Sequence, residues 1–223
     1  MALNGSMNNL RILVKFPSRN RPGQFLKVLR SMVEMSSDPK NIHYLISADY
    51  DDSSMPKEMI NEVADLPSYV KIIWGVSNTK IQAINADMQH AGNWDIVLLA
   101  SDDMIPQVQG WDNIIREGFN NDLDKALWFF DGSQHRICTL VCMGRTRYEK
   151  FGYLYHPSYI SLWCDNEWTE VNNPIKFDTI LFRHEHPAHC GGVQMDALYQ
   201  RNESFFERDR LNYEKRKQQN FPL

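Results

Sequence analysis

The sequence has no excess of positive charge and no long apolar run. Among its 223 residues, 24 are Lys or Arg and 28 are Asp or Glu, so the formal net charge is −4. Nucleic-acid-binding proteins usually carry a basic excess or stripe, which argues against a nucleic-acid partner. No stretch approaches the roughly 20 apolar residues of a transmembrane helix, and the N-terminal MALNGSMNN lacks the layout of a secretion signal. We therefore expect a cytoplasmic protein with no membrane span.

Two nucleotide-binding signatures and a disulfide framework are also missing. No G-x-G-x-x-G follows the first apolar run, and no G-x-x-x-x-G-K-[ST] occurs, which argues against a dehydrogenase and an ordinary ATPase. The few cysteines show no spacing that is typical of paired disulfides in a chain of this length, so we expect reduced thiols. They are Cys138, Cys142, Cys164 and Cys190.

The first hundred residues alternate apolar runs with segments in which apolar residues recur at helical spacing. Hydrophobic residues make up 43% of the chain and charged residues 23%, as in ordinary globular proteins. Alternation of this kind predicts an α/β fold with a mostly parallel central sheet flanked by helices. The expected strands are 10–16, 42–48, 69–75 and 94–100, and the expected helices are 24–35, 56–66, 79–91 and 110–119. Beyond residue 119, aromatic-rich segments predict mixed strands and irregular loops that complete the sheet.

The fourth apolar run, within WDIVLLASDDMIP, ends in the adjacent carboxylates Asp102 and Asp103. Ligands of open α/β sheets bind beyond the carboxyl ends of the strands, where PSRNRP and ADYDD also follow expected strands. Mg²⁺ and Mn²⁺ typically take one or two protein carboxylates together with waters and phosphate oxygens. The pair therefore predicts a hard-cation site, and the alternative is that it caps the next turn.

Four motifs in this order resemble the family-two glycosyltransferases of GT-A fold, over most of the chain. They are PSRNRP at 17–22, Asp49, AIN at 83–85 and SDD at 101–103. The resemblance implies the GT-A type nucleotide-diphospho-sugar transferase fold. It also implies an inverting, metal-dependent transfer from a nucleotide-sugar, a UDP-sugar being the first expectation, to an acceptor hydroxyl. Mn²⁺ or Mg²⁺ is the implied cofactor.

The resemblance also implies roles for individual residues. Ser18 and Asp49 would hold the nucleotide base and ribose, Asp102 would lie near the ribose, and Asp103 would bind the metal on the diphosphate. Ser101 stands where the family motif has an aspartate, which puts the metal dependence in doubt.

Further polar residues belong to the expected donor site. Asn85 ends the A-x-N match and is assigned to substrate binding by the resemblance. Arg19 and Arg21 each have two interpretations, a solvated loop charge or a contact to the diphosphate. Lys80 opens an expected helix, where an ammonium group and a helix N-terminus both favour anions.

The segment LWCDNEWTEV supplies a candidate general base. Asp165 and Glu167 lie among tryptophans, where partial desolvation keeps a carboxylate basic. The segment resembles the family motif E-D-x-[DE]-[LW], with Cys164 in place of the glutamate, and this resemblance implies that Asp165 is the base. Glu167 is expected to contact substrate. The alternative is that both acids only cap a helix.

The segment FRHEHPAHCGG carries several metal-binding residue types. The resemblance implies that a late histidine completes the metal site, and His184 and His186 would point to the same face of a strand. Ordinary polar contacts of these histidines and a zinc site that includes His189 and Cys190 are the alternatives. Asp131, in WFFDGSQ, is a candidate contact to sugar or acceptor.

We expect a single domain over 1–223, with a donor half at about 8–105, an acceptor and catalytic half at about 106–200, and a charged C-terminal helix at 201–223. Two other functions are compatible with the same residues. A nucleotidyltransferase would use the carboxylates to hold metal and a nucleoside triphosphate. A catalytically silent nucleotide- or carbohydrate-binding protein would bind ligand without turnover.

Overall fold

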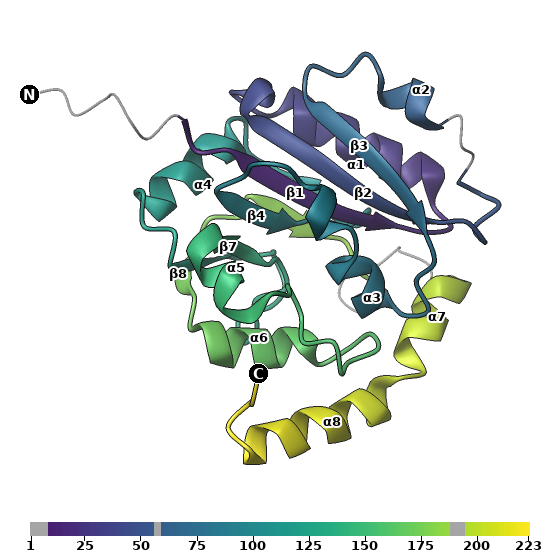
Figure 1. Cartoon of the computed structure of the whole chain (residues 1–223), viewed down its shortest axis with the longest axis vertical. Coiled ribbons are helices and arrows are strands. Elements are labelled where there is room, and N and C mark those ends of the chain that lie inside the picture. The colour runs from purple at the N-terminus through teal and green to yellow at the C-terminus, as the bar shows by residue number, and fades with distance from the viewer. Residues whose placement is uncertain (1–8, 56–58, 188–194) are drawn as a thin grey trace, which may run out of the picture.

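A seven-stranded sheet forms the centre of the computed structural model, which describes residues 9–55, 59–187 and 195–223 (Figure 1). The strands are, in order across the sheet, β3 (Tyr69–Gly75), β2 (Ile42–Asp49), β1 (Ile12–Ser18), β4 (Ile96–Leu99), β7 (Cys142–Gly144), β6 (Ala126–Phe129) and β8 (Ile175–Phe177). All pairs are parallel except β4 with β7 and β6 with β7. The predicted α/β architecture is therefore confirmed, with antiparallel strands only in the second half.

A second, two-stranded sheet lies beside the site end of the central one. It pairs β5 (Met104–Pro106) with β9 (Phe182–His184) in antiparallel register, so that Met104 faces His184. This pairing brings residues that follow the acidic motif next to residues from the late histidine segment. No local pattern predicted this contact.

Both faces of the central sheet are covered, which explains why the strands are apolar at consecutive positions. Successive side chains of a strand point to opposite faces, so Ile12, Val14 and Phe16 join one core while Leu13 joins the other. The first core contains α1 (Pro22–Glu34), α2 (Met59–Val63) and α4 (Trp111–Phe119). The second contains α3 (Lys80–Asn85), part of α5 (Arg145–Phe151) and α6 (Cys164–Asn172); Figure 1 shows α1 behind the sheet and α3 and α5 in front.

The helix predicted over 79–91 is shorter than expected. α3 ends at Asn85, and a separate 3-10 helix follows at Met88–His90. Asp87 adopts a left-handed conformation with φ of 65°, which a continuing helix of L-residues does not allow. Its carboxylate accepts a hydrogen bond from the hydroxyl of Ser47 in β2, so a tertiary contact ends the helix.

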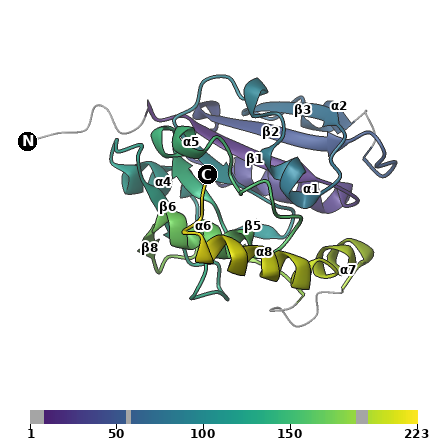
Figure 2. The same ribbon diagram turned by 60° about the horizontal axis from the view of Figure 1, so that its bottom comes forward.

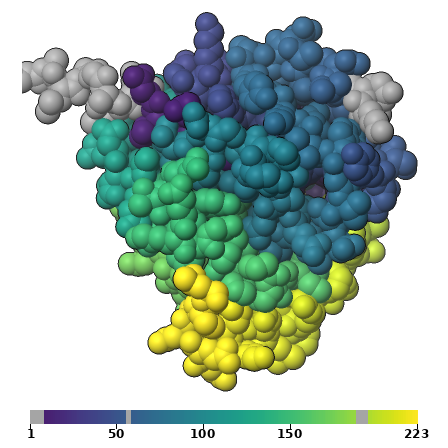
Figure 3. All heavy atoms as spheres, in the orientation of Figure 1, coloured from purple at the N-terminus to yellow at the C-terminus, as the bar shows by residue number. Residues whose placement is uncertain are grey.

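The C-terminal region forms two helices where the sequence predicted one over 201–223. They are α7 (Ala197–Glu203) and α8 (Phe206–Gln218), separated by a turn at residues 204–205. Figures 1 and 2 show α7 beside the site end of the sheet and α8 running along α6. In the space-filling view of Figure 3 the same C-terminal segment covers the lower edge of the molecule.

The cysteines and the helices of the described residues bear on two expectations from the sequence. Cys138, Cys142 and Cys164 are buried free thiols, as predicted, while Cys190 lies outside the described residues. None of the helices in the described ranges combines the length and the apolar character needed to cross a bilayer.

Candidate active site

A cavity of about 310 Å³ lies at the carboxyl ends of β1, β2 and β4. Loops and helix starts converge there because the three strands run in parallel. The cavity brings together most of the predicted site residues. They are Ser18, Arg19, Arg21, Asp49, Lys80, Asp102, Asp103, Asp165, His184 and His186.

One end of the cavity is formed by the loop after β1 and the end of β2. Arg19 donates to Asp49 at 2.8 Å and makes two further bonds to Asp51, at 2.7 and 2.8 Å. The other oxygen of Asp49 accepts the backbone N–H of Ser77 at 2.8 Å. Arg19 is therefore not a solvated loop charge. To contact a diphosphate it would have to give up bonds to Asp49 or Asp51. Its ion pairs instead hold Asp49 in place beside the buried Ser18.

The acidic pair after β4 contains two carboxylates with opposite pKa shifts. Burial and the neighbouring charge of Asp103 raise the pKa of Asp102 to about 6, although Arg21 donates to it at 3.1 Å and opposes the rise. Burial also opposes ionisation of Asp103, but hydrogen bonds from His184 and Ser101 outweigh it and hold the pKa of Asp103 below its usual range. Asp103 therefore stays ionised well below neutral pH, and Asp102 is the carboxylate of the pair that takes up a proton first as the pH falls.

His184 lies between two carboxylates. Its Nε2 is 3.5 Å from Asp103 Oδ2 and its Nδ1 is 3.7 Å from Asp131 Oδ2. Burial lowers the pKa of His184, but these two acids outweigh the effect and raise it to about 9. Asp131 does not line the cavity and lies behind His184. Its carboxylate accepts hydrogen bonds from the backbone N–H groups of Ser133 and Gln134 and from the hydroxyl of Thr139. The direct sugar or acceptor contact predicted for Asp131 is therefore replaced by support of His184.

His186 lines the cavity next to His184. Its ring lies edge-on to Tyr199, with centroids 4.7 Å apart, and 5.5 Å from the ring of His184. Within the described ranges, no three or more His, Cys, Asp and Glu side chains form a group arranged to hold a metal ion. The alternative zinc site involved His189 and Cys190, which lie outside those ranges.

Asp165 reaches the cavity from the first turn of α6. Trp163 precedes this helix with a left-handed backbone, φ of 62°, which turns the chain sharply into the helix. Burial raises the pKa of Asp165, and the positive charge of Lys80 opposes the shift without cancelling it. Lys80 is exposed at the start of α3 and, as far as the described residues show, forms no hydrogen bond or ion pair. A basic carboxylate and an available ammonium group thus share one cavity.

Two residues of α7 and its N-cap, Tyr199 and Asp196, belong to the site but received no role in the sequence analysis. Tyr199, in α7, donates its hydroxyl to Asp103 Oδ2 at 2.9 Å. The guanidinium group of Arg21 lies 3.9 Å from the centroid of the same ring and donates to Asp196 at 2.8 Å. Arg21 and Asp196 are separated by 175 positions, and no local pattern connects them. Only the fold reveals that α7 belongs to the site.

Asn85 and Glu167 do not line the cavity, in contrast to the predicted substrate contacts. The side-chain amide of Asn85 donates to the carbonyl of Tyr155 at 2.7 Å, and its oxygen accepts two backbone N–H groups. Glu167 is buried and accepts two bonds from Arg216, at 2.7 and 2.8 Å, and one from Tyr159 at 2.7 Å. The polar atoms of both residues are used inside the fold, so their roles are structural.

The mostly parallel sheet with helices on both faces and a site at its carboxyl edge has the GT-A type glycosyltransferase fold. The mannosyltransferase PcManGT from Pyrobaculum calidifontis, solved with GDP-Man and Mn²⁺, superposes with a TM-score of 0.64 at 12% identity, over 78% of this chain and 56% of that one. TarS 1–349 from S. aureus, solved with UDP-GlcNAc, gives a TM-score of 0.61 at 11% identity, over 91% of this chain and 67% of that one.

The chain thus spans little more than half the length of the mannosyltransferase. No protein-family profile matches the sequence, and no curated protein matches it. At such low identity the likeness shows the fold alone, and the function has to be argued from the site.

Proposed function

We propose that the protein is an inverting glycosyltransferase that moves a sugar from a nucleoside-diphosphate sugar to an acceptor hydroxyl. The observation that carries this proposal is the shared cavity, in which Asp165 with its raised pKa lies with the anion Asp103 and the cation Lys80. A base and groups that hold a diphosphate are the two requirements of such a transfer. The nucleotide-sugars in the solved structures of the same fold support the donor class.

In this proposal the donor lies along the strand ends, in the half that spans about 8–105. Ser18 and Asp49 would contact the base and ribose, and Asp102 the ribose, because all three line the cavity at the carboxyl ends of β1, β2 and β4. Lys80 would bind a phosphate oxygen, since its ammonium group forms no hydrogen bond or ion pair with the residues that the structure describes and could accept an anion at little cost. The half at about 106–200 would bind the acceptor and supply Asp165.

The donor atoms present fit a divalent metal ion. Asp103 and His184 offer a carboxylate oxygen and an imidazole nitrogen 3.5 Å apart. Both would suit Mn²⁺ once His184 gives up the proton that its raised pKa retains at neutral pH. Mg²⁺ and Mn²⁺ need only one or two protein ligands when a diphosphate supplies others, so the absence of a three-residue cluster in the described ranges is compatible with binding. When bound, the metal would supply positive charge to the departing diphosphate.

Asp165 performs the proton transfer in this proposal. Its carboxylate takes the proton of the acceptor hydroxyl, whose oxygen bonds to the anomeric carbon while the bond to the diphosphate oxygen breaks. The attack from the face opposite the leaving group inverts the anomeric centre. Burial keeps Asp165 basic enough for this role, and the cavity holds the two substrates in one orientation.

Thermal unfolding of wild type and Asp103→Asn tests the donor site. Each is measured with a panel of nucleoside diphosphates, with Mn²⁺ or with chelator. A ligand at 100 times its dissociation constant stabilises the fold by about 2.7 kcal/mol, so a raised midpoint is expected for one diphosphate, with metal and in wild type only. No response to any nucleotide would overturn the proposal.

Product analysis separates the other two functions. A nucleotidyltransferase would release diphosphate from a nucleoside triphosphate and would keep its rate in Asp165→Asn. A silent binding protein would show nucleotide-dependent stabilisation with no consumption of any nucleotide-sugar. The proposed transferase would release a nucleoside diphosphate from its nucleotide-sugar, and Asp165→Asn would stop this release while it leaves binding intact.

A further inference from the structure

The carboxylate of Asp209, in α8, holds three successive backbone N–H groups. Those of Ile160, Ser161 and Leu162 lie between 2.8 and 3.2 Å from its oxygens. The side chain of Asp209 is fully buried, and Arg208 adds a bond at 2.9 Å. Consecutive amides that converge on one anion form a nest, which fixes the backbone between them. Asp209 therefore determines the path of residues 160–162, which lie 47 to 49 positions away in the sequence.

Residues 160–162 connect the cavity wall to the candidate base. All three line the cavity, and the carbonyl of Ile160 accepts the N–H of Ile81 at 3.2 Å, next to Lys80 in α3. The chain then passes through Trp163, with its left-handed backbone, directly into the first turn of α6, where Asp165 lies. A shift of this segment would move the wall and the base together.

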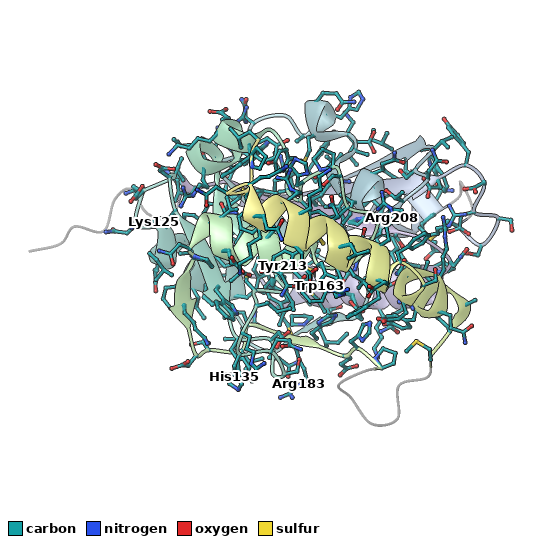
Figure 4. All side chains as sticks on the ribbon, turned by 90° about the horizontal axis from the view of Figure 1, so that it is seen from below. Lys125, His135, Trp163, Arg183, Arg208 and Tyr213 are labelled. Carbon is teal, nitrogen blue, oxygen red and sulfur yellow. The ribbon has the colours of Figure 1, made fainter. Side chains whose placement is uncertain are left out.

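α8 also holds α6 on the other side of the base. Arg216 makes two hydrogen bonds to Glu167, which lies two residues beyond Asp165, and Tyr159 donates to the same carboxylate. Between these two anchors, Tyr213 lies against the Trp163 ring with centroids 5.2 Å apart. Figure 4 shows α8 lying across this region, with the Trp163 and Tyr213 side chains next to each other. The first turn of α6 is thus held before and after Asp165.

We infer that Asp209 is a positioning residue for the transfer step, because the amides that it holds set the direction in which α6 presents Asp165 to the acceptor. This role rests on the proposed function. Without the carboxylate, three backbone N–H groups with little access to water would lose their acceptor, and the segment would have to move to find others. A displacement of about 1 Å at reacting groups costs a rate factor on the order of 100.

Asp209→Asn is the test variant, since the amide keeps the shape but replaces one accepting oxygen with a donor. We expect kcat for sugar transfer to fall about 100-fold, by the cost of such a displacement. The donor KM and the affinity for the nucleoside diphosphate should stay within about twofold of wild type, because the donor contacts come from other elements. Glu207→Gln removes an exposed acid of the same helix and should keep the wild-type kcat.

Two further readouts separate positioning from a loss of folding. Amide hydrogen exchange of residues 160–162 should accelerate in Asp209→Asn, while the amides of α8 stay protected. The acid limb of the pH profile of kcat should move to lower pH, because water that enters beside a displaced Asp165 lowers its pKa. If Asp209→Asn does not fold, Asp209→Glu keeps the charge but moves the carboxylate by one methylene, and it should lose kcat in the same direction.

The outcomes distinguish this role from the function on which it rests. A wild-type protein that neither binds nucleotide nor transfers sugar overturns the proposed function, and the role of Asp209 with it. An active wild type with an equally active Asp209→Asn, or with Asp209→Glu at wild-type kcat, overturns the role of Asp209 alone.

Discussion

The hydroxyl of Tyr199 donates to Asp103 Oδ2, the same oxygen that faces His184 Nε2. A side chain of α7 thus contacts the carboxylate proposed to hold the metal. A metal ion on Asp103 withdraws electron density from this oxygen and weakens the bond from Tyr199, so the bond favours the metal-free protein.

Tyr199→Phe should therefore increase the response of the protein to metal and nucleotide. We expect the free variant to be less stable by about 1.5–3 kcal/mol, the range for a hydrogen bond to a charged group. The rise in the unfolding midpoint caused by nucleoside diphosphate and Mn²⁺ should be larger than in wild type. A smaller rise would show that Tyr199 supports the metal-bound state.

Asp165→Asn should separate chemistry from binding. The variant keeps the size of the side chain but cannot accept the acceptor's proton, so kcat should fall by about 10²–10⁴. Nucleotide affinity in a calorimetric titration should stay at the wild-type value. Retention of more than a tenth of the wild-type kcat would assign the base to another residue.

The pH dependence of stability should report on Lys15, a fully buried residue in the middle of β1. Burial lowers the pKa of Lys15 from 10.5 to about 7, although the charge of Asp87 opposes this shift. Between these two values the unfolded chain holds a proton that the folded chain has lost. The contribution of Lys15 to the free energy of unfolding should then rise with pH, by at most about 1.4 kcal/mol per pH unit.

Lys15→Met provides the comparison for this titration. Denaturant unfolding of both proteins between about pH 7 and pH 10.5, the shifted and ordinary pKa values of Lys15, gives the difference that belongs to this residue. In the variant, the free energy of unfolding should lose the rise with pH that Lys15 causes and otherwise follow the wild-type profile. Parallel profiles in the two proteins would contradict a neutral lysine in the fold.

The ion pair of Glu167 and Arg216 should show strong coupling. Their side chains are 6% and 9% exposed, so removal of either partner leaves a charge with little access to water. Arg216→Met or Glu167→Gln alone should lower the free energy of unfolding by about 3–5 kcal/mol. The double variant should cost less than the sum of the two, as measured by a double-mutant cycle; additive losses would mean that the charges do not interact.

Local sequence patterns were enough to predict the strands and helices of the first half of the chain. The apolar runs that became β1 to β4 and the helical spacing of α1 and α4 were sufficient, since both faces of the sheet are covered. The helix over 79–91 was predicted too long because the contact from Ser47 to Asp87, 40 positions away, overrides helical periodicity. Asp103 lies in the cavity because it follows a predicted strand, whereas Asp165 was assigned to the site by a motif resemblance alone, since α6 was not predicted.

Contacts between residues far apart in the sequence explain the site features that were not predicted. Glu167 fitted a motif position, but its partner Arg216 lies 49 positions away and withdraws it from the cavity. Asp131 was noticed, but its place behind His184 depends on the bond from the His184 N–H to the Asp131 carbonyl. No local pattern identified Tyr199 and Asp196, because their partners Asp103 and Arg21 lie 96 and 175 positions away in the sequence.

The nest at residues 160–162 has a consequence for protein engineering. Asp209 contacts only backbone N–H groups there, and every amino acid except proline provides one. These three residues line the cavity, and their side chains make none of the bonds to Asp209. A combinatorial library at 160, 161 and 162 would therefore vary the surface offered to an incoming alcohol while it leaves the attachment of α6 unchanged.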